Sequence, residues 1–211
     1  MLVAPPTAPP AAASAPRAAP SAAPPEEDGE LRAGRRTFRG MVRPTKGGYE
    51  VRGVIFEDGA LPDALAKSVM DGIPSDPQWF LGSVVRVTAE IVADEYEADA
   101  PDQVGKPRGL VEQRRSGTWL TAKTIERVEL VARAETVEGV LSRSKGFFEV
   151  GKYLVRRDDV AWSLAGSGGG KEGERVRLWG QPRIVRCHPD AQCLEGGSLP
   201  IFDVGRAEKL P

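Results

Sequence analysis

The 211-residue chain has little of what catalysis and metal binding usually need. It holds one histidine, His188, and two cysteines, Cys187 and Cys193, all within one short segment. No run of about 18 or more apolar residues is present, so the sequence predicts no membrane-spanning segment. The formal net charge is −1, so no overall field draws the chain to nucleic acid or to an anionic membrane.

The two cysteines are six positions apart in a segment that reads as one loop. A disulfide between Cys187 and Cys193 closing a short hairpin is geometrically plausible, and two free thiols are the alternative. A zinc site with His188 would need four closed ligands, and the chain has no second cysteine pair to supply them. We expect no metal site, and the state of the two thiols stays open.

Motifs for catalysis are weak. The Gly-rich stretch 166–170 carries Ala165 and Glu172 where a phosphate-cradling loop needs Gly and Ser or Thr, so it reads as a flexible loop. Asp158 and Asp159 are neighbours in sequence, so they are expected to be solvated and not to face each other across a cleft. The lone imidazole has no evident nucleophile beside it. We therefore expect no enzyme activity and no cofactor.

The first 28 residues hold eight prolines and ten alanines, a composition that cannot bury enough apolar surface to order itself. We expect residues 1–30 to form a disordered arm. No secretory signal is visible, yet such an arm is typical of the stretch after a removed export or lipid-anchor segment. A cytoplasmic start is the alternative. We favour an extracytoplasmic location, in the periplasm or envelope, over the cytoplasm.

The remaining sequence contains the same pattern twice. Residues 40–51 align without a gap on residues 139–150, and both stretches read as strand, Lys-Gly turn and strand. Residues 85–90 align on 176–181, and 117–129 on 196–208, in the same order. A repeat of this length predicts two similar units, here 31–133 and 134–211.

β-rich segments dominate both units, with one helix expected at 60–70 and a helix that is short or missing in the second unit. Hairpin, strand, helical insertion, long strand and final strand resemble the order of the oligonucleotide/oligosaccharide-binding (OB) barrel. The residues that carry the resemblance are the Gly-x-Val/Leu strands with their Lys-Gly turn and the stretch Gly173–Gly180, which looks like OB domains of bacterial envelope proteins. The resemblance implies an all-β fold of two tandem five-stranded barrels; a single β-sandwich is the alternative.

Alternation along the strands sorts side chains between two faces. Val51 and Ile55 fall on the expected core face of the first unit with Tyr49, and Val54 on the opposite one. In the second unit the corresponding core set includes Val150 and Leu154. Its outer face gathers three aromatics and two arginines, which we take as the candidate ligand- or partner-binding residues: Phe147, Tyr153, Arg175, Arg177 and Trp179.

Such a face suits the packing of two units or a protein partner, and this is the interpretation we prefer. A single-stranded nucleic acid or an oligosaccharide is the alternative. Nucleic acid needs a basic track, and the arginines between Arg32 and Arg52 are expected to be neutralised within the fold by the acidic stretch 94–102. The sequence thus predicts a non-enzymatic binding or scaffold module of tandem OB-like domains.

Overall fold

The computed structural model describes residues 29–45, 47–69, 74–97, 116–144, 146–165, 169–186 and 198–211. These residues form two β-sheets and two helices, which confirms the expectation of a mostly β chain. The predicted N-terminal arm up to residue 28 and the segment with Cys187, His188 and Cys193 lie outside the described residues. In the described part no helix has both the length and the apolar character to cross a membrane.

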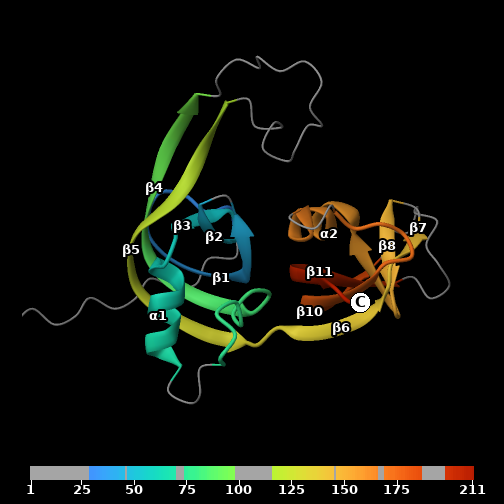
Figure 1. Cartoon of the computed structure of the whole chain (residues 1–211). Coiled ribbons are helices and arrows are strands. Elements are labelled where there is room, and N and C mark those ends of the chain that lie inside the picture. The colour runs from blue at the N-terminus through green and yellow to red at the C-terminus, as the bar shows by residue number, and fades with distance from the viewer. Residues whose placement is uncertain are drawn as a thin grey trace, which may run out of the picture.

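The first sheet contains five strands that pair in a closed ring. They are β1 (Gly34–Thr45), β2 (Gly48–Val51), β3 (Val54–Glu57), β4 (Val84–Glu97) and β5 (Ser116–Ala132), with α1 (Ala60–Ser68) after β3. The order β1-β2-β3-β5-β4 returns to its start because β4 also pairs with β1. The far ends of β4 and β5 continue beyond this ring as a two-stranded arm (Figure 1). We call this part the first unit.

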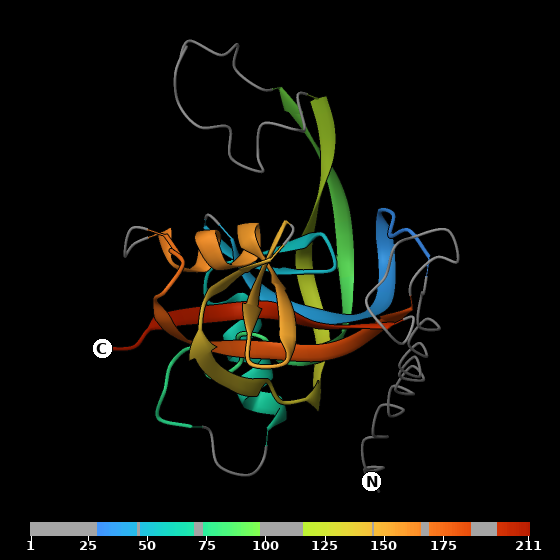
Figure 2. The ribbon, with the colours of Figure 1, turned by 90° about the vertical axis from the view of Figure 1, so that its right-hand side faces the viewer.

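The second sheet repeats the arrangement with its first strand broken in two. Its strands are β6 (Glu135–Val140), β7 (Ser142–Ser144), β8 (Phe147–Val150), β9 (Tyr153–Arg156), β10 (Arg175–Arg186) and β11 (Ser198–Lys209), with α2 (Arg157–Ser163) directly after β9. The order is β6-β10-β11-β9-β8-β7. Only Leu141 separates β6 from β7, so one bent segment forms both ends of this sheet. Figure 2 shows β10 and β11 crossing the width of the molecule, and we call this part the second unit.

Strand pairing follows the alignment of the repeat residue by residue. Arg43 pairs with Glu50 in the first unit, and the aligned residues Ser142 and Glu149 pair in the second. Every pair of the β2–β3 hairpin likewise has its counterpart in the β8–β9 hairpin. The register even shifts at the same place, after Thr88 in β4 and after its counterpart Trp179 in β10. The two units therefore share one backbone plan.

The two units enclose separate hydrophobic cores. The first core includes Phe38, Phe56 and Phe80, all essentially inaccessible to solvent, and the second includes Leu178 and Phe202. Burial of such side chains on the inner face of each curved sheet supplies the main stabilising free energy. A single hydrophobic centre, as the sandwich alternative requires, is not what these clusters form.

The expectation that the helix of the second unit is short or missing is met by a short one. α2 has seven residues, and Val160 on it and Leu164 just after it are buried like the aligned residues Leu61 and Leu65 of α1. One expectation needs correction: the face assigned to the second strand of the first hairpin was wrong, because Val54 is fully buried whereas Ile55 is half-buried. In the second hairpin Leu154 is buried, as expected.

The cause is the two-residue turn between the strands of the hairpin. Arg52 and Gly53 both have positive φ, which is the signature of the tight hairpin turn that matches the strand twist. This turn places Val51 directly opposite Val54, and opposite residues share a face. If the alternation of faces is instead continued along the chain through Arg52 and Gly53, Ile55 is placed on the face of Val51 and Val54 on the opposite one, which is the reverse of the observed arrangement.

Candidate binding groove between the two units

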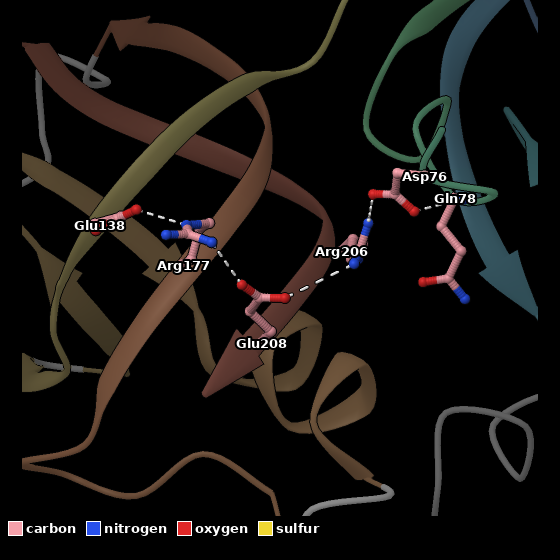
Figure 3. A network of polar contacts seen from close by, with 6 residues as sticks. All are labelled: Asp76, Gln78, Glu138, Arg177, Arg206 and Glu208. Atoms are coloured by element: carbon pink, nitrogen blue, oxygen red, sulfur yellow. Dashed lines mark hydrogen bonds and ion pairs between the residues drawn. The ribbon is translucent and has the colours of Figure 1, made fainter. Parts of the chain in front are cut away.

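Arg177 and Trp179, two of the predicted site residues, belong to a polar network that joins the units. The Arg177 guanidinium donates to Glu138 Oε1 at 2.5 Å and to Glu208 Oε1 at 2.9 Å. Glu208 also pairs with Arg206 at 3.7 Å, and Arg206 donates to Asp76 of the first unit. Figure 3 shows this chain of contacts from β6 across β10 and β11 to the loop that precedes β4.

Trp179 lies beneath the arginines of this network. The guanidinium of Arg206 is 4.4 Å from the centroid of its ring, and that of Arg177 is 5.8 Å away. Guanidinium groups at these distances are attracted by the quadrupole of the indole. The pKa of Asp76 is lowered by a hydrogen bond from the Gln78 backbone N–H and by its bond to Arg206. These groups satisfy one another, as in the core of an interface.

The remaining predicted site residues lie elsewhere. Tyr153 stands opposite Val150, so it is on the core side of its hairpin and packs on Phe202 at 5.5 Å between ring centroids. The assignment of Tyr153 to the outer face was therefore wrong, for the same reason as at Val54. Phe147 is half-buried on β8, and Arg175 is exposed at the start of β10. The structure brings Arg177 and Trp179 together but does not build one surface from all five residues.

Glycines allow the two units to approach each other backbone to backbone. A Cβ atom on Gly205 would lie 2.3 Å from the Cα of Gly82, and one on Gly82 would lie 2.8 Å from the carbonyl oxygen of Trp179. The side-chain amide of Gln181 donates to the carbonyls of Gly82 and Arg133 at 2.9 and 3.0 Å. This close contact fixes the second unit against the first.

Beside this contact the units leave a groove of about 600 Å³, here called the inter-unit groove. The first unit contributes residues of β1, β2, β3 and β5, and the second contributes α2, the adjoining end of β9 and part of β11. In Figure 1, α2 lies on the side of the second unit that faces the first. The charged and large apolar residues that line the groove are Arg43, Glu50, Ile55, Trp119, Arg156, Asp158, Asp159 and Trp162.

Asp159 is the most unusual of these residues. Its Oδ2 atom is buried and accepts no hydrogen bond, and Arg43 of the first unit lies 3.9 Å away, beyond hydrogen-bond distance. Burial raises the pKa of this carboxyl, and the opposing effects of Arg43 and Arg156 do not cancel it. The expectation that Asp158 and Asp159 are both solvated is wrong for Asp159, because the fold brings the first unit over it.

Trp162 adds an accessible aromatic surface next to this carboxyl. It follows Asp159 by three residues and Asp158 by four on α2, spacings that place side chains on one side of a helix. Trp162 remains 45% exposed, the largest exposed aromatic surface among the described residues. Sequence reasoning missed this set, although an Asp-Asp-x-x-Trp pattern on a short amphipathic segment was the available signal.

The basic cluster near the N-terminal end of β1 is neutralised by partners other than those predicted. Arg35 forms a two-pronged ion pair with Glu126 at 2.7 Å, and Arg36 donates to backbone carbonyls. Arg52 donates to the carbonyl of Gly29. Most of the acidic stretch 94–102 lies outside the described residues, and Asp94 pairs with Lys123.

Within the described ranges, no group of three or more histidine, cysteine, aspartate or glutamate side chains is arranged to hold a metal ion. No protein-family model, curated protein or solved structure matches this chain. Any functional proposal therefore depends on the geometry of the molecule itself.

Proposed function

We propose that this protein is a non-enzymatic binding module, built from two OB-like five-stranded barrels, that holds a segment of a partner protein in the inter-unit groove. The observation that carries the proposal is the exposed Trp162 beside the buried carboxyl of Asp159 in a groove of about 600 Å³. Concave sites with aromatic walls and a few polar groups are typical of ligand binding. An exposed tryptophan is also the residue type most enriched at binding hot spots.

The charges that line the inter-unit groove favour a protein segment over a nucleic acid. Glu50, Asp158 and Asp159 line the groove together with only Arg43 and Arg156, so a phosphate backbone would meet more carboxylates than guanidinia. The Arg177 and Trp179 face, preferred from the sequence, is occupied by its own ion pairs and by the contact with the first unit. This supports the packing interpretation of those two residues and moves the candidate site to the groove.

An oligosaccharide is the second candidate. Indole faces beside carboxylates and guanidinia also suit a sugar ring with its hydroxyl groups, and Trp119 and Trp162 line the same groove. The outcome of a direct binding experiment separates these two ligands.

The test is selection from a random peptide library displayed on phage, with the purified chain as bait. We expect peptides selected on the wild type to bind Trp162→Ala at least about tenfold more weakly, a loss of about 1.4 kcal/mol. Phe147→Ala is the matched control, because Phe147 is a half-buried aromatic of the face predicted from sequence and does not line the groove. Melting curves of both variants establish that each is folded.

The proposal fails if no peptide is enriched, or if enriched peptides lose affinity for Phe147→Ala and keep it for Trp162→Ala. Titration with a neutral trisaccharide is run in parallel. Binding of the sugar that depends on Trp162, without peptide binding, would replace the protein segment by a glycan.

A further inference from the structure

An arginine stacked on a tryptophan recurs in the molecule. Trp79 carries the guanidinium of Arg133 at 5.8 Å from its ring centroid, and Trp179 carries Arg206 at 4.4 Å. Arg206 also forms ion pairs with two carboxylates, those of Asp76 and Glu208. The molecule thus holds an arginine between an indole face and two carboxylates where its own units join.

In the inter-unit groove the same groups are present without the arginine. Trp162 supplies the indole, and Asp158 and Asp159 supply two carboxylates from the same side of α2. The cation–π contacts of the described residues include none at the ring of Trp162. The buried Oδ2 of Asp159 has no donor.

The guanidinia already in the groove do not fill this place. Arg43 approaches Asp159 only to 3.9 Å, too far for a hydrogen bond. Arg156 is exposed at the end of β9, and its effect on Asp159 acts through space. Three carboxylates and two guanidinia line the groove, so one additional monocation would balance its charge.

We infer that the inter-unit groove takes an arginine side chain of a partner protein, with its guanidinium stacked on Trp162 and donating to Asp159 and Asp158. This inference rests on the proposed function, since it names the residue of the partner segment that the groove recognises. Guanidinium suits the site better than ammonium because its planar face stacks on an indole while its edge donates to carboxylates. Hydrogen bonds from a guanidinium to carboxylates are charge-assisted and stronger than those between neutral groups.

The decisive probe is an arginine-containing pentapeptide with glycine and serine flanks, acetylated and amidated, titrated into the full chain by NMR. Its control is the same peptide with citrulline, which keeps the shape of arginine and lacks the charge. We expect the arginine peptide to shift the indole N–H signal of Trp162, assigned with Trp162→Phe, and the citrulline peptide to bind at least tenfold more weakly. A lysine peptide should fall between the two.

Variants of the chain locate the interaction. Asp159→Asn should weaken the arginine peptide at least fivefold while leaving the melting temperature unlowered, so the loss cannot come from unfolding. Glu172→Gln removes an exposed carboxylate of the second unit outside the groove and should bind like the wild type. The citrulline peptide should not distinguish Asp159→Asn from the wild type.

Several results would overturn the inference. They are equal affinity for arginine and citrulline, wild-type binding by Asp159→Asn, and the absence of a shift at Trp162 with millimolar arginine peptide. If library peptides bind in a Trp162-dependent manner but tolerate replacement of arginine by citrulline, the proposed function stands and the arginine inference fails. If no library peptide depends on Trp162, the proposed function itself fails.

Discussion

The two units carry the same triad of charged residues at aligned positions and use it differently. In the first unit Glu129 on β5 pairs with Arg86 on the neighbouring strand and with Arg127, two residues earlier in the sequence. In the second unit Glu208 on β11 pairs in the same way with Arg177 and Arg206. In the first unit the second arginine is 68% exposed, whereas in the second unit it reaches Asp76 of the other unit. The triads are Arg86, Glu129 and Arg127, and Arg177, Glu208 and Arg206.

The residue beside each triad explains this difference. Thr88 of the first unit is buried and hydrogen-bonded to Thr37 at 2.9 Å, and its counterpart is Trp179, which carries Arg206. Where the register shifts after Thr88 and after Trp179, the last strand of each unit has one extra residue. In the first unit this residue is Glu126, which is exposed and pairs with Arg35, whereas in the second it is Gly205, which touches Gly82. A few substitutions on a repeated backbone therefore convert a solvated surface of one copy into an interface in the other.

The largest effect on stability is expected at Gly82 of the first unit, whose counterpart in the second unit is Gly173. Gly82 and Gly173 have nearly the same positive φ, 81° and 89°, but only Gly82 faces backbone atoms of the other unit, 2.8 Å from a built Cβ. Gly173→Ala should cost about 1–2 kcal/mol for the left-handed conformation. Gly82→Ala should cost roughly 1–3 kcal/mol more because of the clash. Urea unfolding measures both, and equal losses would show that the contact between the units adds nothing.

A smaller effect is expected from the second arginine of each triad. Arg206→Ala removes the stacking on Trp179 and the bond to Asp76, and should cost about 1–2 kcal/mol. Arg127→Ala removes a largely exposed side chain and should cost less than about 0.5 kcal/mol. Chemical denaturation of the two variants gives the comparison directly. Similar losses for both would mean that the second triad does not act as a clamp.

The smallest effect is expected at Asp159, which stands where the aligned residue of α1 is Ala60. Burial raises its pKa despite Arg43 and Arg156, while Asp158 and Asp203 raise it further. Between the ordinary pKa and the raised one, the folded state keeps a proton that the unfolded chain releases. Stability therefore falls as pH rises through this window.

Asp159→Asn should remove that pH dependence and raise the melting temperature at neutral pH. Glu172→Gln, which changes an exposed carboxylate of the second unit outside the groove, serves as the control. Melting curves from pH 3 to pH 8 report both properties. A lower melting temperature for Asp159→Asn at neutral pH would show that the charged carboxylate stabilises the fold. A gain in stability with a loss of peptide binding is typical of a residue kept for function.

Much of the fold could be predicted because duplication writes the same pattern twice. The alignment of residues 40–51 on 139–150 predicted a strand, a turn and a second strand in each copy, and the structure has β1 with β2 and β7 with β8 there. Period-two alternation placed Val51 and Val150 correctly inside the two cores. It failed at Val54 and Tyr153, because the hairpin turn aligns residues across strands in a way that counting along the chain does not follow.

The candidate site was less accessible to sequence reasoning. Arg177 and Trp179 were predicted to belong to a binding face, and the structure gives both of them internal partners. Asp159 and Trp162 were missed. Their spacing was visible in the sequence, but the burial of Asp159 was not, since it depends on residues of the first unit more than a hundred positions away, such as Arg43. Periodicity within one segment contains no information on which unit will cover it.

The hydrogen bonds of the Gln181 amide to Gly82 and Arg133 have a practical consequence for anyone who divides this chain. If the chain were cut between β5 and β6, Trp179 and Arg206 on the second fragment would lose their contacts with the first unit. Asp76 on the first fragment would lose its bond to Arg206. Each half would then expose apolar surface and charged groups without their partners. The pair should accordingly melt in one cooperative step, and expression of isolated halves should yield poorly soluble material.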